Sequence, residues 1–171
     1  MSEIWEIIPL EGIGPLKLGM SYEDVDNFAR QLGKVDALDK QTLPSGQEIY
    51  KEYRDLEAPF LTYYAERLID ISVDHHTRFN IQFENTSVFE NHSKLVLQTL
   101  QAREGAAYWG LGNVIFPTLS IATQGFLVDL SSEKILEFWE DGEEKPPKVI
   151  TVAGAGAYDE FLSRYERISI E

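Results

Sequence analysis

The tripeptide Asp74-His75-His76 combines residue types that bind metal ions or transfer protons. On a strand, Asp74 and His76 lie on the same face, and with Asp70 they would supply an incomplete set of oxygen and nitrogen ligands. A lone motif of this kind is weak, and a polar strand end that faces water explains it more simply. We therefore expect no bound metal, and a metal-dependent hydrolase that uses Asp70, Asp74 and His76 is the least favoured alternative.

Gly154-Ala155-Gly156 lies between a predicted strand and a predicted helix, as the phosphate-binding loop of a dinucleotide site does. Asp159 takes the third glycine position, where its carboxylate would face the pyrophosphate, and too few residues follow for a second parallel strand. A tight turn into the last helix explains the glycines better. His92 lies on the apolar side of a predicted helix, with no Ser or Cys motif nearby to activate. The sequence thus predicts no cofactor, no catalytic residues and no enzymatic activity.

Two acidic segments have the character of an interface. Residues 137–144 combine five carboxylates with a tryptophan beside a predicted exposed turn, and aromatic side chains surrounded by charge are typical of tight interfaces. An equally favoured alternative is that Phe138 or Trp139 belongs to the core, beside a turn that is acidic only because it faces water. Residues 48–57 hold four acids and two bases on a predicted edge strand, where charge more simply prevents edge-to-edge pairing. The predicted partner-binding residues are Glu137, Trp139, Glu140, Asp141, Glu143 and Glu144.

The charge of the chain restricts its partners. Its 171 residues include 15 Lys and Arg against 29 Asp and Glu, for a net charge of −14. Such a chain repels phosphate backbones and anionic lipids, so we expect neither a nucleic acid nor a membrane as partner. The acidity either maintains solubility or steers a cationic protein to the surface. The absence of cysteine excludes disulfides and thiol catalysis. With no secretory signal and no apolar run of ~18 residues, we expect a cytoplasmic protein.

The hydrophobic pattern predicts a single α+β domain over residues 1–171, with mainly antiparallel sheets of about seven to nine strands and three helices. Ser21 and Asp24 form a capping box for a first helix that ends at Gly33, and Ser87 with Glu90 forms one for a second helix that ends near Arg103. Residues 34–47 are expected to be a polar loop. A last helix is expected over residues 157–167. The predicted strands are 3–10, 48–54, 60–65, 68–75, 79–83, several within 107–130, 134–139 and 148–153.

Alternation along residues 68–75 places Ile69, Ile71 and Val73 on one face of their strand. The short connections at residues 66–67 and 76–78 predict β-hairpins on both sides of it.

The segment from Gly12 to Ser21, running into Glu23 and Val25, resembles the opening of many small bacterial proteins. Some of these are immunity proteins of polymorphic toxin systems, including contact-dependent growth inhibition. The small, acidic, cysteine-free and aromatic-rich profile is also similar to theirs. The resemblance implies a protein that neutralises a toxin domain by occluding its active site. Many such toxins are basic nucleases, to which carboxylates present a substitute for phosphate.

The leading prediction is therefore an immunity protein that binds a basic toxin domain, expected to be a nuclease, through charge complementarity and a few aromatic anchors. An alternative from a different class of function is a small-ligand-binding or regulatory domain. Such a domain would need an aromatic-lined pocket on a sheet.

Overall fold

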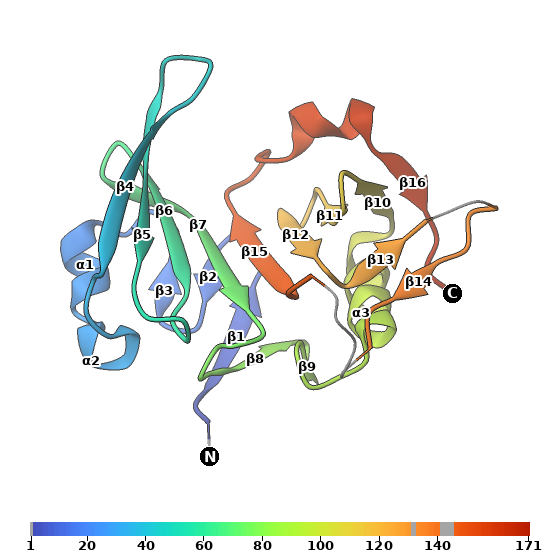
Figure 1. Ribbon diagram of the computed structural model, residues 1–171, viewed down its shortest axis with the longest axis horizontal. Coiled ribbons are helices and arrows are strands. Elements are labelled where there is room, and N and C mark those ends of the chain that lie inside the picture. The colour runs from blue at the N-terminus through green and yellow to red at the C-terminus, as the bar shows by residue number, and fades with distance from the viewer. Residues whose placement is uncertain (1, 131–132, 141–145) are drawn as a thin grey trace.

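A nine-stranded antiparallel sheet forms the centre of the computed structural model, which describes residues 2–130, 133–140 and 146–171 (Figure 1). Within those residues the sheet is strongly bent, and β15 and β7 pair at its middle to join the two halves. In spatial order the strands are β16 (Glu166–Ile168), β10 (Ala107–Gly110), β11 (Asn113–Phe116), β12 (Ile121–Gln124), β15 (Val149–Ala153), β7 (Arg67–Asp74), β6 (Phe60–Tyr64), β5 (Glu48–Tyr53) and β4 (Ala37–Thr42).

Two smaller sheets and four helical segments complete the α+β fold in the described part of the chain, which confirms the predicted fold class. The second sheet has the order β3 (Leu16–Lys17), β2 (Gly12–Ile13), β1 (Ile4–Ile8), β8 (Asn80–Phe83) and β9 (Thr86–Ser87). The third pairs β13 (Leu127–Asp129) with β14 (Glu137–Phe138). The helices are α1 (Tyr22–Asp26), α2 (Ala29–Leu32), α3 (Ser93–Glu104) and the 3₁₀ helix η1 (Asp159–Arg164).

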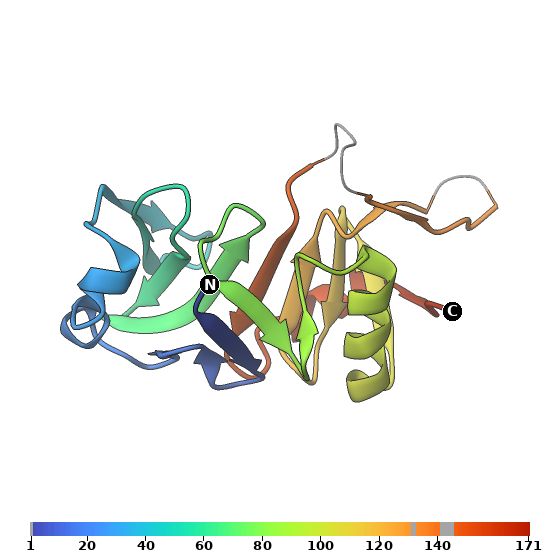
Figure 2. The same cartoon turned by 90° about the horizontal axis from the view of Figure 1, so that it is seen from below.

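A continuous core runs from Trp5 in β1 to Ile170 near the C-terminus. It lies between one face of the large sheet and the elements that cover that face. The second sheet, α1 and α2 cover the part formed by β5–β7, and α3 lies along the other half (Figure 2). The hairpin expected at residues 76–78 is wrong, because β8 leaves β7 and pairs in parallel with β1. Through this parallel pair, the chain that leaves the nine-stranded sheet after β7 becomes part of the second sheet.

A β-bulge shifts the face of one strand residue. Thr62 pairs with Asp70 and Tyr63 pairs with Leu68, so Ile69 is the extra residue of β7. The bulge turns Leu68 into the core and leaves Ile69 37% exposed, whereas strict alternation predicts Ile69 inside. Ile71 and Val73 are buried as predicted.

The first predicted helix begins where expected. Ser21 Oγ accepts from the backbone N–H of Asp24 at 3.1 Å, and an Asp24 carboxylate oxygen accepts from the N–H of Ser21 at 3.0 Å, which is a complete capping box. The helix divides into α1 and α2 around residues 27–28 and ends at Gly33, whose φ of 83° favours glycine.

The second predicted helix starts later than its capping pattern suggests. Ser87 belongs to β9 and its hydroxyl donates to Asn80 Oδ1 at 2.8 Å, so α3 begins only after His92. His92 caps the helix, because its Nδ1 accepts from the N–H of Lys94 at 3.1 Å. The helix ends at Glu104, close to the predicted end near Arg103, and Gly105 follows it in the left-handed conformation.

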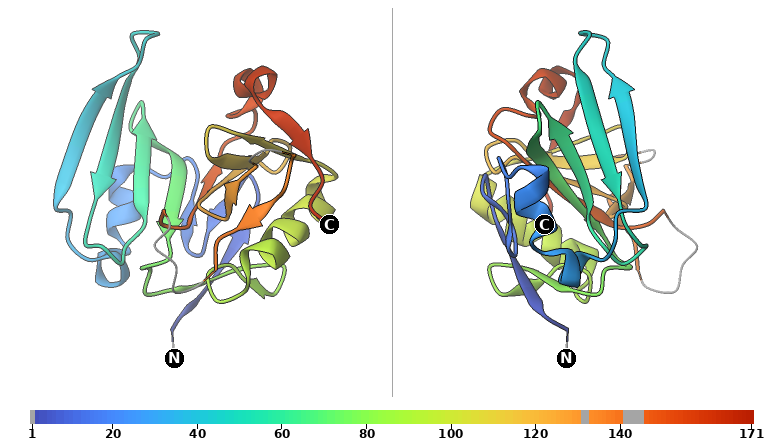
Figure 3. Two further views of the ribbon diagram at one scale, coloured as in Figure 1. Left: turned by 45° about the vertical axis from the view of Figure 1, so that its right-hand side comes forward. Right: turned by 90° about the vertical axis from the view of Figure 1, so that its left-hand side faces the viewer.

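Residues 34–47 are not simply a loop. They contain β4, an edge strand in which all six residues are exposed, and with β5 it forms a hairpin that projects from the sheet (Figures 1 and 3). A strand with no buried face has no alternating apolar pattern, which explains the error. The predicted last helix is instead η1; Phe161 within it and Tyr158 and Tyr165 at its two ends are half-buried. Among the described residues, no helix combines the length and apolar character that crossing a membrane requires.

Candidate functional site

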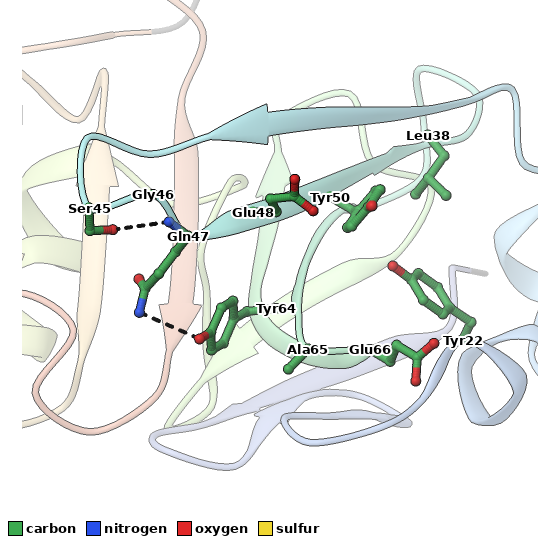
Figure 4. Close-up of a pocket in the computed structure, with 10 residues that line it drawn as sticks. All are labelled: Tyr22, Leu38, Ser45, Gly46, Gln47, Glu48, Tyr50, Tyr64, Ala65 and Glu66. Carbon is green, nitrogen blue, oxygen red and sulfur yellow. Dashed lines mark hydrogen bonds between the residues drawn. The ribbon is translucent and has the colours of Figure 1, made fainter.

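A groove lined by tyrosines and carboxylates lies between α1, the β4–β5 hairpin and the turn that joins β6 to β7 (Figure 4). Its larger part has a volume of about 750 Å³ and continues into a smaller one through Tyr22 and Leu38, which line both. We call it the tyrosine groove and define it by three tyrosines, Tyr22, Tyr50 and Tyr64, and five carboxylates, Glu23, Asp26, Glu48, Glu52 and Glu66.

The local structure of each element directs these side chains into the groove. Successive residues of β5 point to opposite faces, so Glu48, Tyr50 and Glu52 share the face that looks toward α1. Tyr22 is the first residue of α1, and its ring packs on Tyr63 of the sheet at 4.2 Å between centroids. Glu66 lies in the two-residue turn between β6 and β7, where its φ of 63° matches the turn that such hairpins favour.

The groove carries an excess of negative charge. Burial raises the pKa of the Tyr22 hydroxyl, and the nearby Tyr50, Glu66 and Glu52 raise it further. Lys40 on β4 forms an ion pair of 2.6 Å with Glu48, and this contact raises the pKa of the lysine. Glu52 and Glu66 beside Tyr22, and Glu48 beside Lys40, thus add negative charge to the surroundings of these two groups.

A buried arginine supports the floor of the groove and pairs with two of its five carboxylates. The Arg54 side chain is 1% exposed and contacts Glu52 at 3.2 Å and Asp26 at 3.7 Å. In the part of the chain that the structure describes, Glu23 and Glu66 form no ion pair. Three of the five carboxylates are therefore paired with Arg54 or Lys40, and Glu23 and Glu66 are left for a partner.

Apolar and aromatic surface lies exposed beside these carboxylates. Leu38 is 49% exposed and Tyr64 is 40% exposed, and the Tyr64 hydroxyl accepts a weak 3.5 Å hydrogen bond from Gln47 Nε2 (Figure 4). Carboxylates bind ammonium and guanidinium groups with charge-assisted hydrogen bonds, and tyrosine faces attract the same cations. The groove is thus suited to lysine and arginine side chains on the surface of another protein.

The predicted interface at residues 137–144 looks different. Glu137 and Glu140 are exposed, and Glu140 contacts His92 Nε2 at 3.2 Å. Asp141, Glu143 and Glu144 lie outside the described residues. Trp139 is not an exposed anchor, because only 8% of it is accessible.

Trp139 has a structural position instead. The Lys148 ammonium group lies 4.2 Å from the centre of its ring, and Lys148 is itself buried. The Ser93 hydroxyl donates to the Trp139 carbonyl at 3.0 Å, which ties this segment to the start of α3. The alternative of a core tryptophan beside an acidic turn therefore describes Trp139 better.

The residues of the alternative metal site do not converge. Asp70 and Asp74 are four residues apart on β7, which separates their backbones by about 13 Å. Asp74 accepts from the backbone N–H of His76 at 2.8 Å, as a carboxylate in a local turn does. Among the described residues, no three His, Cys, Asp or Glu side chains form a group that could hold a metal.

Gly154 and Gly156 lie in the turn between β15 and η1, and Gly156 has a φ of 78°.

Sequence reasoning missed most of the tyrosine groove. It places Leu38 in a loop and attaches no function to Tyr22, Tyr64 or Glu66. The usable signal is the acid-rich stretch at residues 48–57, which the sequence predicts as a protected edge strand. That prediction is wrong, because β5 pairs with both β4 and β6, and β4 forms the edge of the sheet.

Comparison with known proteins adds no relative: no family model matches the chain, and neither a curated protein nor a solved structure matches it.

Proposed function

We propose that this chain is a cytoplasmic immunity protein, which binds a basic toxin domain through the tyrosine groove and neutralises it by covering its active site. The toxin that fits best is a nuclease, because an enzyme that grips phosphate presents lysine and arginine at its active site. The proposal implies no cofactor and no turnover.

One observation carries this proposal: five carboxylates and three tyrosines from distant parts of the chain line a single groove. Glu23 comes from α1, Glu48 and Glu52 from β5, and Glu66 from the turn after β6. Generic acidity would not require aromatic rings among the carboxylates, whereas recognition of a cationic surface uses both. The net charge of −14 adds a field that attracts such a partner over a longer distance.

Reversing two charges of the groove is expected to abolish protection. Glu23 and Glu66 form no ion pair among the described residues, so changing both to lysine leaves the internal contacts of the groove intact. Each lysine would face a basic partner, and we expect affinity to fall at least about a hundredfold. The partner to use is the C-terminal domain of a large secreted protein encoded in the adjacent reading frame, and the readouts are the dissociation constant and growth on co-expression.

A matched control separates the effect of the charges in the groove from the effect of the net charge of the chain. Glu160→Lys with Glu171→Lys changes the total charge equally at two exposed positions outside the groove. This variant is expected to protect nearly as well as the unaltered chain. Equal loss in both variants, unchanged affinity in the groove variant, or a neighbouring frame that encodes no basic domain would contradict the proposal.

A further inference from the structure

The face of the large sheet opposite the core has a hollow of about 480 Å³ over β5, β6, β7 and β15. Side chains alternate across a sheet, so neighbours of the buried Leu61, Ile71 and Val152 point into this hollow. Most of its lining is apolar or aromatic. Tyr53 and Phe60 meet edge to face there, with ring centroids 5.6 Å apart.

A row of three polar residues crosses the hollow. Lys51 on β5 is opposite Thr62 on β6, and Thr62 is opposite Asp70 on β7. The two charged residues are thus two strands apart, with their backbones separated by about 10 Å. A second polar contact, 2.7 Å between the hydroxyls of Ser72 and Thr151, lies beside this row.

Asp70 is a half-buried carboxylate in an apolar setting. Burial raises the pKa of its carboxyl, while a hydrogen bond with Thr62 and the charge of Lys51 act in the opposite direction. Its charge also raises the pKa of Tyr158, although burial of that hydroxyl is the larger cause, so Tyr158 lies near it. Aspartate is depleted in strands, and Thr62 and Lys51 offset only part of the cost of burying the Asp70 charge.

The bulge in β7 adds exposed apolar surface next to this carboxylate. Ile69 is the extra residue of the bulge, lines the hollow and remains 37% exposed. The hollow presents isoleucine, phenylalanine and valine around one carboxylate, Asp70, and its one lysine, Lys51, is two strands away from that carboxylate. This lining matches a ligand with a cationic head on Asp70 and an apolar body.

We propose that this hollow binds a small organic amine, with the ammonium group on Asp70 and Thr62 and the apolar body along Phe60, Ile69 and Val149. The ammonium would donate to the Asp70 carboxylate, a charge-assisted hydrogen bond inside a partly desolvated site. The hollow and the tyrosine groove lie on opposite faces of β5, so this site does not depend on the proposed immunity function.

The test uses 2-phenylethylamine as the probe and 2-phenylethanol as its neutral analogue, titrated into the full chain and followed by backbone amide NMR. The amine should shift the signals of residues 51, 62, 70, 72 and 151 and bind at least about tenfold more tightly than the alcohol. Equal affinity for the two probes, or amine shifts confined to the tyrosine groove, would overturn the proposal.

Two variants complete the test. Asp70→Asn keeps the shape of the side chain and should weaken amine binding at least about tenfold while leaving alcohol binding unchanged. Asp74→Asn removes a carboxylate from the same strand, outside the hollow, and should bind the amine as the unaltered chain does. Amine affinity that survives Asp70→Asn, or that falls equally in both variants, would overturn the proposal. The comparison of amine with alcohol on the unaltered chain decides the matter even if Asp70→Asn does not fold.

Discussion

Replacing Arg54 with methionine is expected to lower the free energy of unfolding by about 3–5 kcal/mol. The guanidinium group is buried, contacts Glu52 and Asp26, and donates to the carbonyl of Gly33, so it ties β5 to both α1 and the end of α2. Without it, the Glu52 carboxylate, with a side chain 6% exposed, is left buried without its cation. Chemical denaturation of the purified variant measures the loss.

Two further variants test this cause. Removing both charges, with Arg54→Met and Glu52→Leu together, should restore most of the lost stability, because no buried charge then lacks a partner. Arg103→Met breaks an ion pair with Glu84 whose side chains are 62% and 44% exposed, and should cost less than about 1 kcal/mol. If Arg54→Met costs no more than Arg103→Met, the arginine does not hold the floor of the groove.

Trp5→Ala is expected to destabilise the chain by about 3–5 kcal/mol. The Trp5 ring is 1% exposed and stacks on Phe79 at 3.7 Å, so its loss opens a cavity between the second sheet and the chain that leaves β7. Gly14 shows how closely the ring is packed, because a Cβ there would lie 2.5 Å from it. Thermal and denaturant unfolding give the change in stability.

Trp5→Phe is the matched control for that prediction. It retains an aromatic ring against Phe79, and the indole N–H that it removes has no hydrogen-bond partner among the described residues. We expect a loss of about 1–1.5 kcal/mol, mainly from reduced volume. A phenylalanine variant as unstable as the alanine variant would mean that the indole N–H, rather than burial of the ring, stabilises this region.

The capping signal of one helix was predicted correctly, whereas two signals that depend on a neighbouring strand were not. The capping box of Ser21 and Asp24 needs only its own helix turn and formed as expected. The similar pattern of Ser87 and Glu90 failed because Ser87 bonds with Asn80 on β8, which no local pattern contains. Ile69 was placed inside because a bulge depends on how β6 pairs with β7.

The candidate site depends on tertiary structure even more strongly. The tyrosine groove joins α1, β4, β5 and the turn after β6, and sequence reasoning had identified only the acid-rich part of β5. Trp139 stood next to five carboxylates in the sequence and was therefore a reasonable anchor, yet Lys148 packs on its ring in the interior. Strand β4 went unrecognised because both of its faces are exposed.

The measurement that tests the central claim most directly is the association rate of the chain with its basic partner as a function of salt concentration. The account predicts that the rate constant falls at least about tenfold between roughly 0.02 M and 0.5 M salt. It also predicts that the dependence is much weaker for Glu23→Lys with Glu66→Lys, and only slightly less steep for Glu160→Lys with Glu171→Lys. A rate that does not respond to salt, or that responds equally in all three proteins, would contradict recognition through the acidic tyrosine groove.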